Sequence, residues 1–113
     1  MAGQRARRHA PRTIDLCGIA KGYAVDRMAA VLRQYGIHQA LVALDGELRA
    51  LGSQASGTPW AVAVEAPVPG QRSAQGVLEL QEMAVATSGN YRRFFTVQGQ
   101  RLAHSMDPRT QAP

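Results

Sequence analysis

Two different spacings of apolar residues divide the chain into a helical part and a longer β-rich part. Between residues 16 and 35, apolar side chains recur at helical intervals, at Ile19, Tyr23, Met28, Val31 and Leu32. Asp15 precedes this run as a candidate N-cap, and Gly36 follows it as a candidate helix stop. The pattern therefore predicts one helix over residues 16–35.

Beyond Gly36 the chain alternates between short β-rich runs and turn residues. The runs cover residues 39–44, 47–51, 60–65, 76–80, 83–87, 93–98 and 100–105. Asp45-Gly46 and Gln98-Gly99 are typical of tight hairpin turns, whereas residues 67–75 contain two prolines and a glycine and predict a looser surface loop. These connections predict strands that pair mainly antiparallel.

One helix followed by strands predicts an α+β fold, in which an amino-terminal helix packs on a mainly antiparallel sheet of six to seven strands. A sheet with apolar residues on both faces needs more cover than one helix supplies. We therefore expect either an exposed apolar face or a covering partner, which could be a second copy of the chain (a homodimer) or a missing segment of polypeptide.

The charge of the chain is concentrated at its start. Four of the five units of the net charge of +5 come from the first twelve residues, at Arg5, Arg7, Arg8 and Arg12. We expect residues 1–13 to form a basic disordered tail, residues 14–113 to form the domain, and the protein to bind no specific nucleic acid. The positive start is followed by no apolar stretch, so this chain shows no export signal and its compartment stays open.

Cys17 is the single cysteine, so the chain forms no internal disulfide and offers no zinc-type site. A buried small hydrophobic residue is its expected role. Lys21, the single lysine beside twelve arginines, lies between Gly18 and Gly22 at the helix start, where free N–H groups attract anions. From spacing alone, a phosphate contact and a solvated surface lysine remain equally open.

Two further polar clusters occur later in the chain. Thr87 and Ser88 lie in a turn that suits a polar ligand, although a turn that satisfies its own backbone is favoured. His104, Asp107 and Thr110 lie where a strand gives way to a turn. The carboxylate and hydroxyl suit a hard cation such as Mg²⁺ and the histidine suits a proton acceptor, but a plain Asx-type turn is favoured from these residues alone.

In order along residues 14–113, these clusters resemble the signatures of the ApbE family, the FAD:protein FMN transferases. Residues 15–26 read DLCGIAKGYAVD and depart from the family form DLGGIAKGYAVD only at Cys17. Residues 44–52 read LDGELRALG, with Asp45 and Glu47 in place of a glycine and an aspartate. Four motifs in family order over almost the whole chain are highly specific.

The other two signatures lie near the end of the chain. Residues 84–95 read AVATSGNYRRFF and carry Asn90 in place of an aspartate. Residues 104–113 read HSMDPRTQAP and match the family at six positions, whereas Ser105, Met106 and Gln111 depart. The resemblance implies part of an ApbE-like, T-fold-related domain, in a family that often works in the periplasm or anchored to a membrane.

The resemblance implies a Mg²⁺-dependent transfer of FMN from FAD to a threonine or serine hydroxyl of a target flavoprotein, with release of AMP. His104 would be the base, and Asp107, Thr110 and a backbone carbonyl near Gly18 would hold the metal. The residues that would contact the flavin nucleotide are Lys21, Asp26, Thr87 and Ser88. Two alternatives stay open: a truncated flavin- or metal-binding fragment without transferase activity, and a non-enzymatic, self-associating remnant.

Overall fold

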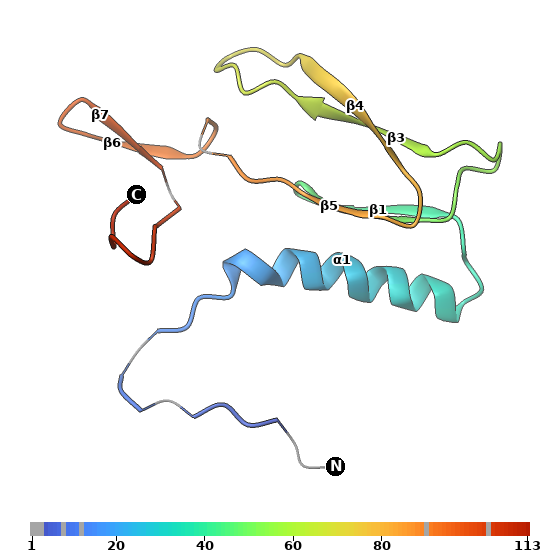
Figure 1. Cartoon of the computed structure of the whole chain (residues 1–113), viewed down its shortest axis with the longest axis horizontal. Helices are drawn as coiled ribbons and strands as arrows, with labels where there is room; N and C mark the ends of the chain where they lie inside the picture. Colours follow the sequence, from blue (N-terminus) through green and yellow to red (C-terminus); the bar gives the residue numbers. More distant parts are fainter. Residues whose placement is uncertain (1–3, 8, 12, 90, 104) are drawn as a thin grey trace.

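A single helix precedes seven strands along the chain. The computed structural model describes residues 4–7, 9–11, 13–89, 91–103 and 105–113. The elements are α1 (Cys17–Gln34), β1 (Ala40–Leu44), β2 (Glu47–Leu51), β3 (Trp60–Glu65), β4 (Ala74–Leu80), β5 (Ala84–Ala86), β6 (Phe94–Val97) and β7 (Gln100–Ala103) (Figure 1). The predicted helix and the predicted strands are confirmed to within a few residues at each end. Residues 1–13 contribute no helix or strand among those described, and their disorder stays a prediction.

Both ends of α1 are closed by local hydrogen bonds. The Asp15 carboxylate accepts a bond of 2.7 Å from the N–H of Cys17, although Leu16 and not Asp15 occupies the N-cap position. At the other end Gly36 has φ +77°, its N–H bonds to Arg33 O, and the N–H of Ile37 bonds back to Leu32 O. This double pattern is a Schellman motif, so the predicted stop at Gly36 is confirmed.

The two predicted hairpins are confirmed. β1 and β2 pair antiparallel through a two-residue turn, in which Asp45 has φ +46° and Gly46 has φ +99°. β6 and β7 pair in the same way through Gln98 at φ +51° and Gly99 at φ +79°. Positive φ at both central residues is the geometry that matches the twist of the flanking strands.

The strands form three small sheets, so the prediction of one sheet of six to seven strands is wrong. β1, β2 and β5 make one sheet, whereas β3–β4 and β6–β7 are separate two-stranded ribbons. The two edges of β2 are taken by β1 and by β5, which pairs with it from Glu47 to Arg49. Because neither edge of β2 is left open, β3 has no access to the strand that precedes it in the chain.

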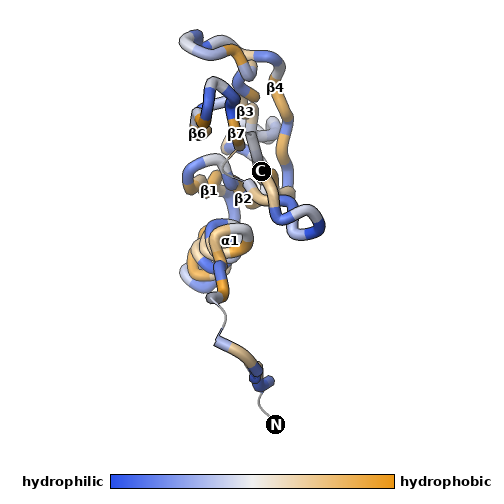
Figure 2. The backbone as a smooth tube through the Cα atoms, turned by 90° about the vertical axis from the view of Figure 1, so that its left-hand side faces the viewer, coloured by the Kyte–Doolittle hydropathy of each residue, from blue (hydrophilic) through white to orange (hydrophobic). Residues whose placement is uncertain are grey.

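The elements are stacked in layers around a small core. α1 lies along one side of the β1–β2–β5 sheet, and the β3–β4 ribbon lies on the other (Figures 1 and 2). The buried cluster between α1 and the sheet consists of Val25, Ala29, Val42 and Leu51, with Leu32 and Ala40 packed against it. The Trp60 indole N–H donates to Leu51 O at 3.2 Å and thereby ties β3 to the end of β2.

Much of the apolar surface is left open. The radius of gyration is 18.4 Å, against about 13 Å for a compact domain of this length. The accessible surface is 9471 Å², against about 6,000 Å² for a compact protein of this mass. Ile19, Tyr23 and Tyr35 of α1 are among the exposed apolar side chains, and Figure 2 shows hydrophobic segments on α1 and β4. An exposed apolar surface is therefore present, as expected.

Cys17 is exposed, so the expectation of a buried cysteine is wrong. As the first residue of α1 it lies at the end of the helix, beyond the part that packs on the sheet. None of the helices that the described residues form is long and apolar enough to cross a membrane.

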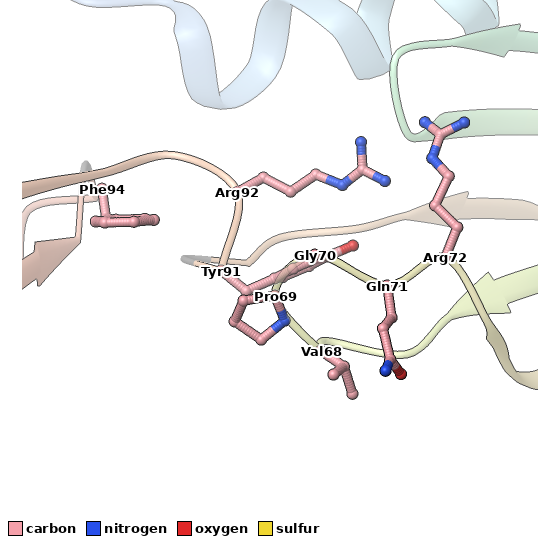
Figure 3. Close-up of a pocket in the computed structure, with 8 residues that line it drawn as sticks. All are labelled: Val68, Pro69, Gly70, Gln71, Arg72, Tyr91, Arg92 and Phe94. Atoms are coloured by element: carbon pink, nitrogen blue, oxygen red, sulfur yellow. The ribbon is translucent and has the colours of Figure 1, made fainter.

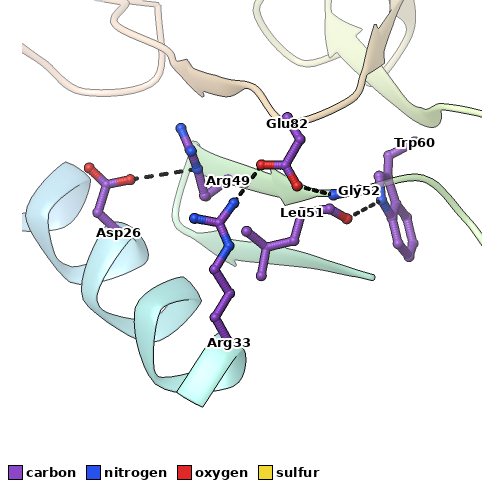
Figure 4. A network of polar contacts seen from close by, with 7 residues as sticks. All are labelled: Asp26, Arg33, Arg49, Leu51, Gly52, Trp60 and Glu82. Carbon is purple, nitrogen blue, oxygen red and sulfur yellow. Dashed lines mark hydrogen bonds and ion pairs between the residues drawn. The ribbon is translucent and has the colours of Figure 1, made fainter. Parts of the chain in front are cut away.

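Glu82 ties three elements together where β4 turns into β5. Its carboxylate accepts bonds from the Gly52 N–H at 2.6 Å and from the Arg33 guanidinium at 2.5 Å (Figure 4). The Gly52 hydrogen bond and the charge of Arg33 lower the pKa of Glu82. The end of α1, the end of β2 and the β4–β5 turn thus meet at one carboxylate.

The lowered pKa of Glu82 predicts a pH dependence of stability. A carboxyl with a depressed pKa in the folded state stabilises the protein above its unfolded-state pKa, near 4.3, and the contribution is lost as the pH falls. Glu82→Gln should therefore lower the urea midpoint at pH 7, with a difference from wild type that closes as the pH falls below about 5. Glu79→Gln, at an exposed glutamate of β4, serves as the control. Equal pH profiles for Glu82→Gln and Glu79→Gln would contradict this role.

Candidate functional site

Lys21 of α1 is held against the β1–β2 turn. Its ammonium lies 2.9 Å from the Glu47 carboxylate and 3.7 Å from that of Asp45, and it donates to the Asp45 carbonyl oxygen at 3.3 Å. The Glu47 side chain is only 14% exposed, and its Oε2 is closed off from solvent. The helix start and the hairpin turn are therefore joined by a short, partly buried ion pair.

The surroundings of Lys21 are acidic, and its side chain is 39% exposed. It is not an isolated positive charge, because two carboxylates face it. The hydrogen bond to Glu47 raises the pKa of Lys21, so the ammonium stays protonated at neutral pH. The ammonium carries three N–H donors, and its closest contacts are the Glu47 carboxylate and the Asp45 carbonyl oxygen.

Thr87 lies at the same turn from the other side. Its N–H and its hydroxyl both donate to the carbonyl oxygen of Gly46, at 3.2 and 3.0 Å. Lys21 and Thr87 thus bond to the carbonyls of two consecutive residues, Asp45 and Gly46. Ser88 follows on the surface and is exposed. The structure brings two of the predicted nucleotide contacts together, on a turn that also satisfies its own backbone.

Gly46 is needed for this arrangement. A Cβ at this position would lie 2.7 Å from Thr87 Oγ1, and the backbone has φ +99°. Gly46→Ala should destabilise the protein by roughly 1–2 kcal/mol from backbone strain alone, and more because Thr87 must move. Gly57→Ala is the matched control, because Gly57 has φ +84° with open space around it. Urea unfolding should show a larger loss for Gly46→Ala, and the Thr87 amide resonance should shift only in that variant. Equal losses of stability in Gly46→Ala and Gly57→Ala would show that the close approach of Thr87 adds nothing to the cost.

Asp26 lies farther along α1. Its carboxylate is 4.0 Å from the Arg49 guanidinium of β2 (Figure 4). This weak ion pair joins α1 to β2 at a point different from the Lys21 contacts. The structure therefore places Asp26 on the same helix as Lys21 but with a different partner.

Asp107 organises the turn near the end of the chain. Its carboxylate accepts a bond from the Arg109 N–H at 2.9 Å and contacts the Arg109 guanidinium at 3.2 Å. Its backbone forms a bridge with Ala112. These contacts make the Asx-type turn that the residues favour, and the bonds from Arg109 lower the pKa of Asp107.

The donors available near this turn suit a hard cation. Asp107 offers a carboxylate and Thr110 an exposed hydroxyl, and Figure 1 shows the carboxy-terminal end of the chain on the same side of the molecule as the start of α1. Within the described parts of the chain no three His, Cys, Asp or Glu side chains gather as a metal cage. Mg²⁺ commonly takes one or two carboxylates and completes its shell with water and substrate phosphate, so these oxygens fit it. His104, the predicted base, lies outside the described residues.

The sequence missed the partners of the site residues. Glu47 and Asp45 are noticed there only as departures from a family signature, whereas the structure shows that they hold Lys21. Nothing in the sequence marks Arg49 as the partner of Asp26. Acidic residues after a hairpin turn are a weak signal, because the sequence does not show which helix the turn will face.

Comparisons with known proteins agree on one family. The model of the ApbE family matches residues 2–113. The FAD:protein FMN transferase of Haemophilus influenzae is 42% identical over 101 residues, which are 88% of this chain and 29% of that protein. The corresponding protein of Vibrio cholerae is 43% identical over 100 residues, with 88% and 30% covered.

Solved structures give the same result. The ApbE protein of Thermotoga maritima superposes with a TM-score of 0.79 at 38% identity, over 88% of this chain and 32% of that one. The flavinyl transferase ApbE of Pseudomonas stutzeri gives 0.71 at 43% identity, with 88% and 30% covered. The chain spans less than a third of the length of these relatives. The chain belongs to the ApbE family.

Proposed function

We propose that this chain carries the nucleotide and metal contacts of an FAD:protein FMN transferase. The observation that carries the proposal is the joint attachment of Lys21 and Thr87 to the Asp45-Gly46 turn, near the start of α1. Two relatives that bear this name are 42% and 43% identical to the chain over the matched region. The substrates would be FAD and a target flavoprotein with an acceptor threonine or serine.

The flavin nucleotide would lie along the surface between α1 and residues 87–88. Lys21 would direct its third N–H at a phosphate oxygen, and the Thr87 and Ser88 hydroxyls would bond to polar groups of the nucleotide. Asp26 would contact the same ligand farther along α1. Glu47 already neutralises Lys21, so its pull on an anion depends on a cation beside the phosphates.

The metal would be Mg²⁺, held by the Asp107 carboxylate, the Thr110 hydroxyl and a backbone carbonyl near Gly18. When bound there, it would neutralise charge on the pyrophosphate. Arg109 holds the Asp107 carboxylate in the turn and keeps it ionised, which is the form that a metal ligand needs.

The transfer itself breaks one bond and forms one. The acceptor hydroxyl oxygen attacks the phosphorus of the FMN half of FAD, the bridging P–O bond breaks, and AMP leaves with the bridging oxygen. His104 would take the proton of the hydroxyl. FMN is then joined to the acceptor by a phosphoester bond, and no oxidation or reduction takes place.

The test is incubation of the chain with FAD, Mg²⁺ and an acceptor flavoprotein, read as flavin fluorescence that stays with the acceptor on a denaturing gel. Fluorescence that requires all three additions supports the proposal. Calorimetric titration with FAD runs beside it, because a fragment that binds without transfer gives heat but no fluorescent band. Absence of a band under every metal condition would contradict the transferase proposal.

Association is a second candidate role, favoured by the exposed apolar side chains of α1. Sedimentation at micromolar concentration measures it directly. Dimers without flavin transfer would favour a self-associating remnant, whereas a monomer that transfers flavin would exclude that role.

A further inference from the structure

A hollow of ≈ 580 Å³ lies beside the loop that joins β3 and β4, apart from the Lys21 contacts. It is bounded by the loop between β3 and β4 and by the segment that leads into β6 (Figure 3). Its lining comprises Val68, Pro69, Gly70, Gln71, Arg72, Tyr91, Arg92 and Phe94. Its volume lies within the range of sites that bind small molecules or short peptide segments.

One carboxylate organises the charged side of this hollow. Glu65 accepts a bond of 2.6 Å from the Tyr91 hydroxyl, contacts the Arg92 guanidinium at 2.5 Å, and lies 3.7 Å from Arg72. The hydrogen bonds from Tyr91 and Arg92 lower the pKa of Glu65, so it is ionised at neutral pH. The end of β3 thereby fixes a tyrosine and an arginine that are far away in the sequence.

The charges at the hollow do not balance. Two guanidinium groups, of Arg72 and Arg92, face the single carboxylate of Glu65, which leaves one positive charge uncompensated among these three groups. The Arg72 side chain is 84% exposed and is the weaker of the two partners of Glu65. Figure 3 shows both guanidinium groups on the same side of the loop. Its position makes Arg72 the cation most available to an incoming anion.

Apart from Gln71, the remaining lining is apolar and aromatic. Val68 and Phe94 are each 43% exposed, so the hollow is open at its rim. An open hollow can hold an extended polypeptide segment, whereas small molecules are usually bound in sites that enclose most of their surface. Tyrosine, phenylalanine and arginine together are the residues enriched at protein interfaces. The composition therefore fits a protein segment that brings both apolar and negative side chains.

We propose that this hollow is a docking site for an acidic, partly apolar segment of a protein partner. Tyr91 follows Thr87 by four residues, so a segment bound here lies close along the chain to the proposed nucleotide contacts. Identification of the partner as the acceptor flavoprotein rests on the proposed function. The docking itself rests on the charges and side chains of the hollow.

The experiment measures peptide binding by the full chain. The probe is a fluorescein-labelled decapeptide of alternating glutamate and leucine, followed by fluorescence anisotropy at 50 and 200 mM salt. Arg72→Glu should weaken binding by roughly tenfold or more, because it replaces attraction with repulsion. Arg27→Glu on α1 makes the same charge change at another exposed arginine and should leave binding nearly unchanged. Both variants keep the basic residues 1–13, so any attraction of this segment for the probe is the same in both and cancels when they are compared.

The outcomes separate docking from transfer. Equal weakening in the two variants, or none in Arg72→Glu, would overturn the docking site. AMP that binds in the hollow and displaces the peptide would identify a nucleotide site and would also overturn the docking site.

If the flavin assay fails while binding of the peptide still depends on Arg72, the docking site stands and the transferase proposal falls. Where transfer occurs, Arg72→Glu should raise KM for the acceptor and leave KM for FAD unchanged. Circular dichroism checks the fold, and Arg72→Gln replaces the variant if folding is lost.

Discussion

Asp107→Ala is expected to reduce flavin transfer on the order of 10²–10³-fold, because it removes the proposed carboxylate ligand of Mg²⁺. The same change removes the acceptor of the Arg109 N–H and guanidinium bonds, so the turn itself would loosen. Loss of activity in this variant alone would therefore not separate metal binding from turn structure.

Asp107→Asn makes that separation. The amide oxygen can still accept the Arg109 N–H and keep the Asx-type turn, whereas the negative charge is lost. Transfer by this variant should fall nearly as far as in Asp107→Ala, while titration with Mg²⁺ in the presence of FAD should show weakened binding. An Asp107→Asn variant as active as wild type at the same Mg²⁺ concentration would remove Asp107 from the metal site.

Leu51→Ala is expected to have the largest effect on stability, about 2–5 kcal/mol. Leu51 is fully buried at the end of β2, where it packs with Val25, Ala29 and Val42 between α1 and the sheet. So few residues are buried that the cavity left by a leucine cannot be shared among many neighbours.

Leu78→Ala provides the control, because this substitution removes the same atoms from a side chain that is 39% exposed, on β4. Urea denaturation at constant protein concentration should show a much lower midpoint for Leu51→Ala than for Leu78→Ala. Similar midpoints would mean that the cluster between α1 and the sheet does not hold the fold together.

Local features of the fold were predictable because their signals lie within a few residues. The run from Ile19 to Leu32, with Gly36 behind it, predicts α1, and the structure ends the helix there with a Schellman motif. Asp45-Gly46 predicts the β1–β2 turn for the same reason, since an aspartate and a glycine readily take positive φ.

The division into three sheets could not be predicted in this way. It depends on β5, which returns after more than thirty residues to take the free edge of β2. Many strands with similar β-rich composition compete for that edge, and residue spacing does not rank them. The contacts of Glu82 with Arg33 and Gly52 could not be predicted either, because these residues are also far from Glu82 in the sequence.

The candidate site was predictable in its members but not in its contacts. Lys21 between its two glycines, and the hydroxyls of Thr87 and Ser88, stand out in the sequence. In the structure Lys21 and Thr87 meet at one turn. The charge balance at Lys21 was not visible, because Glu47 reaches it only once β2 packs beside α1. The Glu65 cluster and the hollow beside it depend in the same way on long-range packing.

The most direct test of the central claim is the mass of an acceptor flavoprotein after incubation with this chain, FAD and Mg²⁺. Intact-protein mass spectrometry should show a gain equal to one FMN joined with loss of water, mapped to a threonine or serine, with one AMP released for each flavin attached. An unchanged acceptor mass, in a reaction where a full-length relative modifies the same acceptor, would contradict the assignment of transferase activity to this chain.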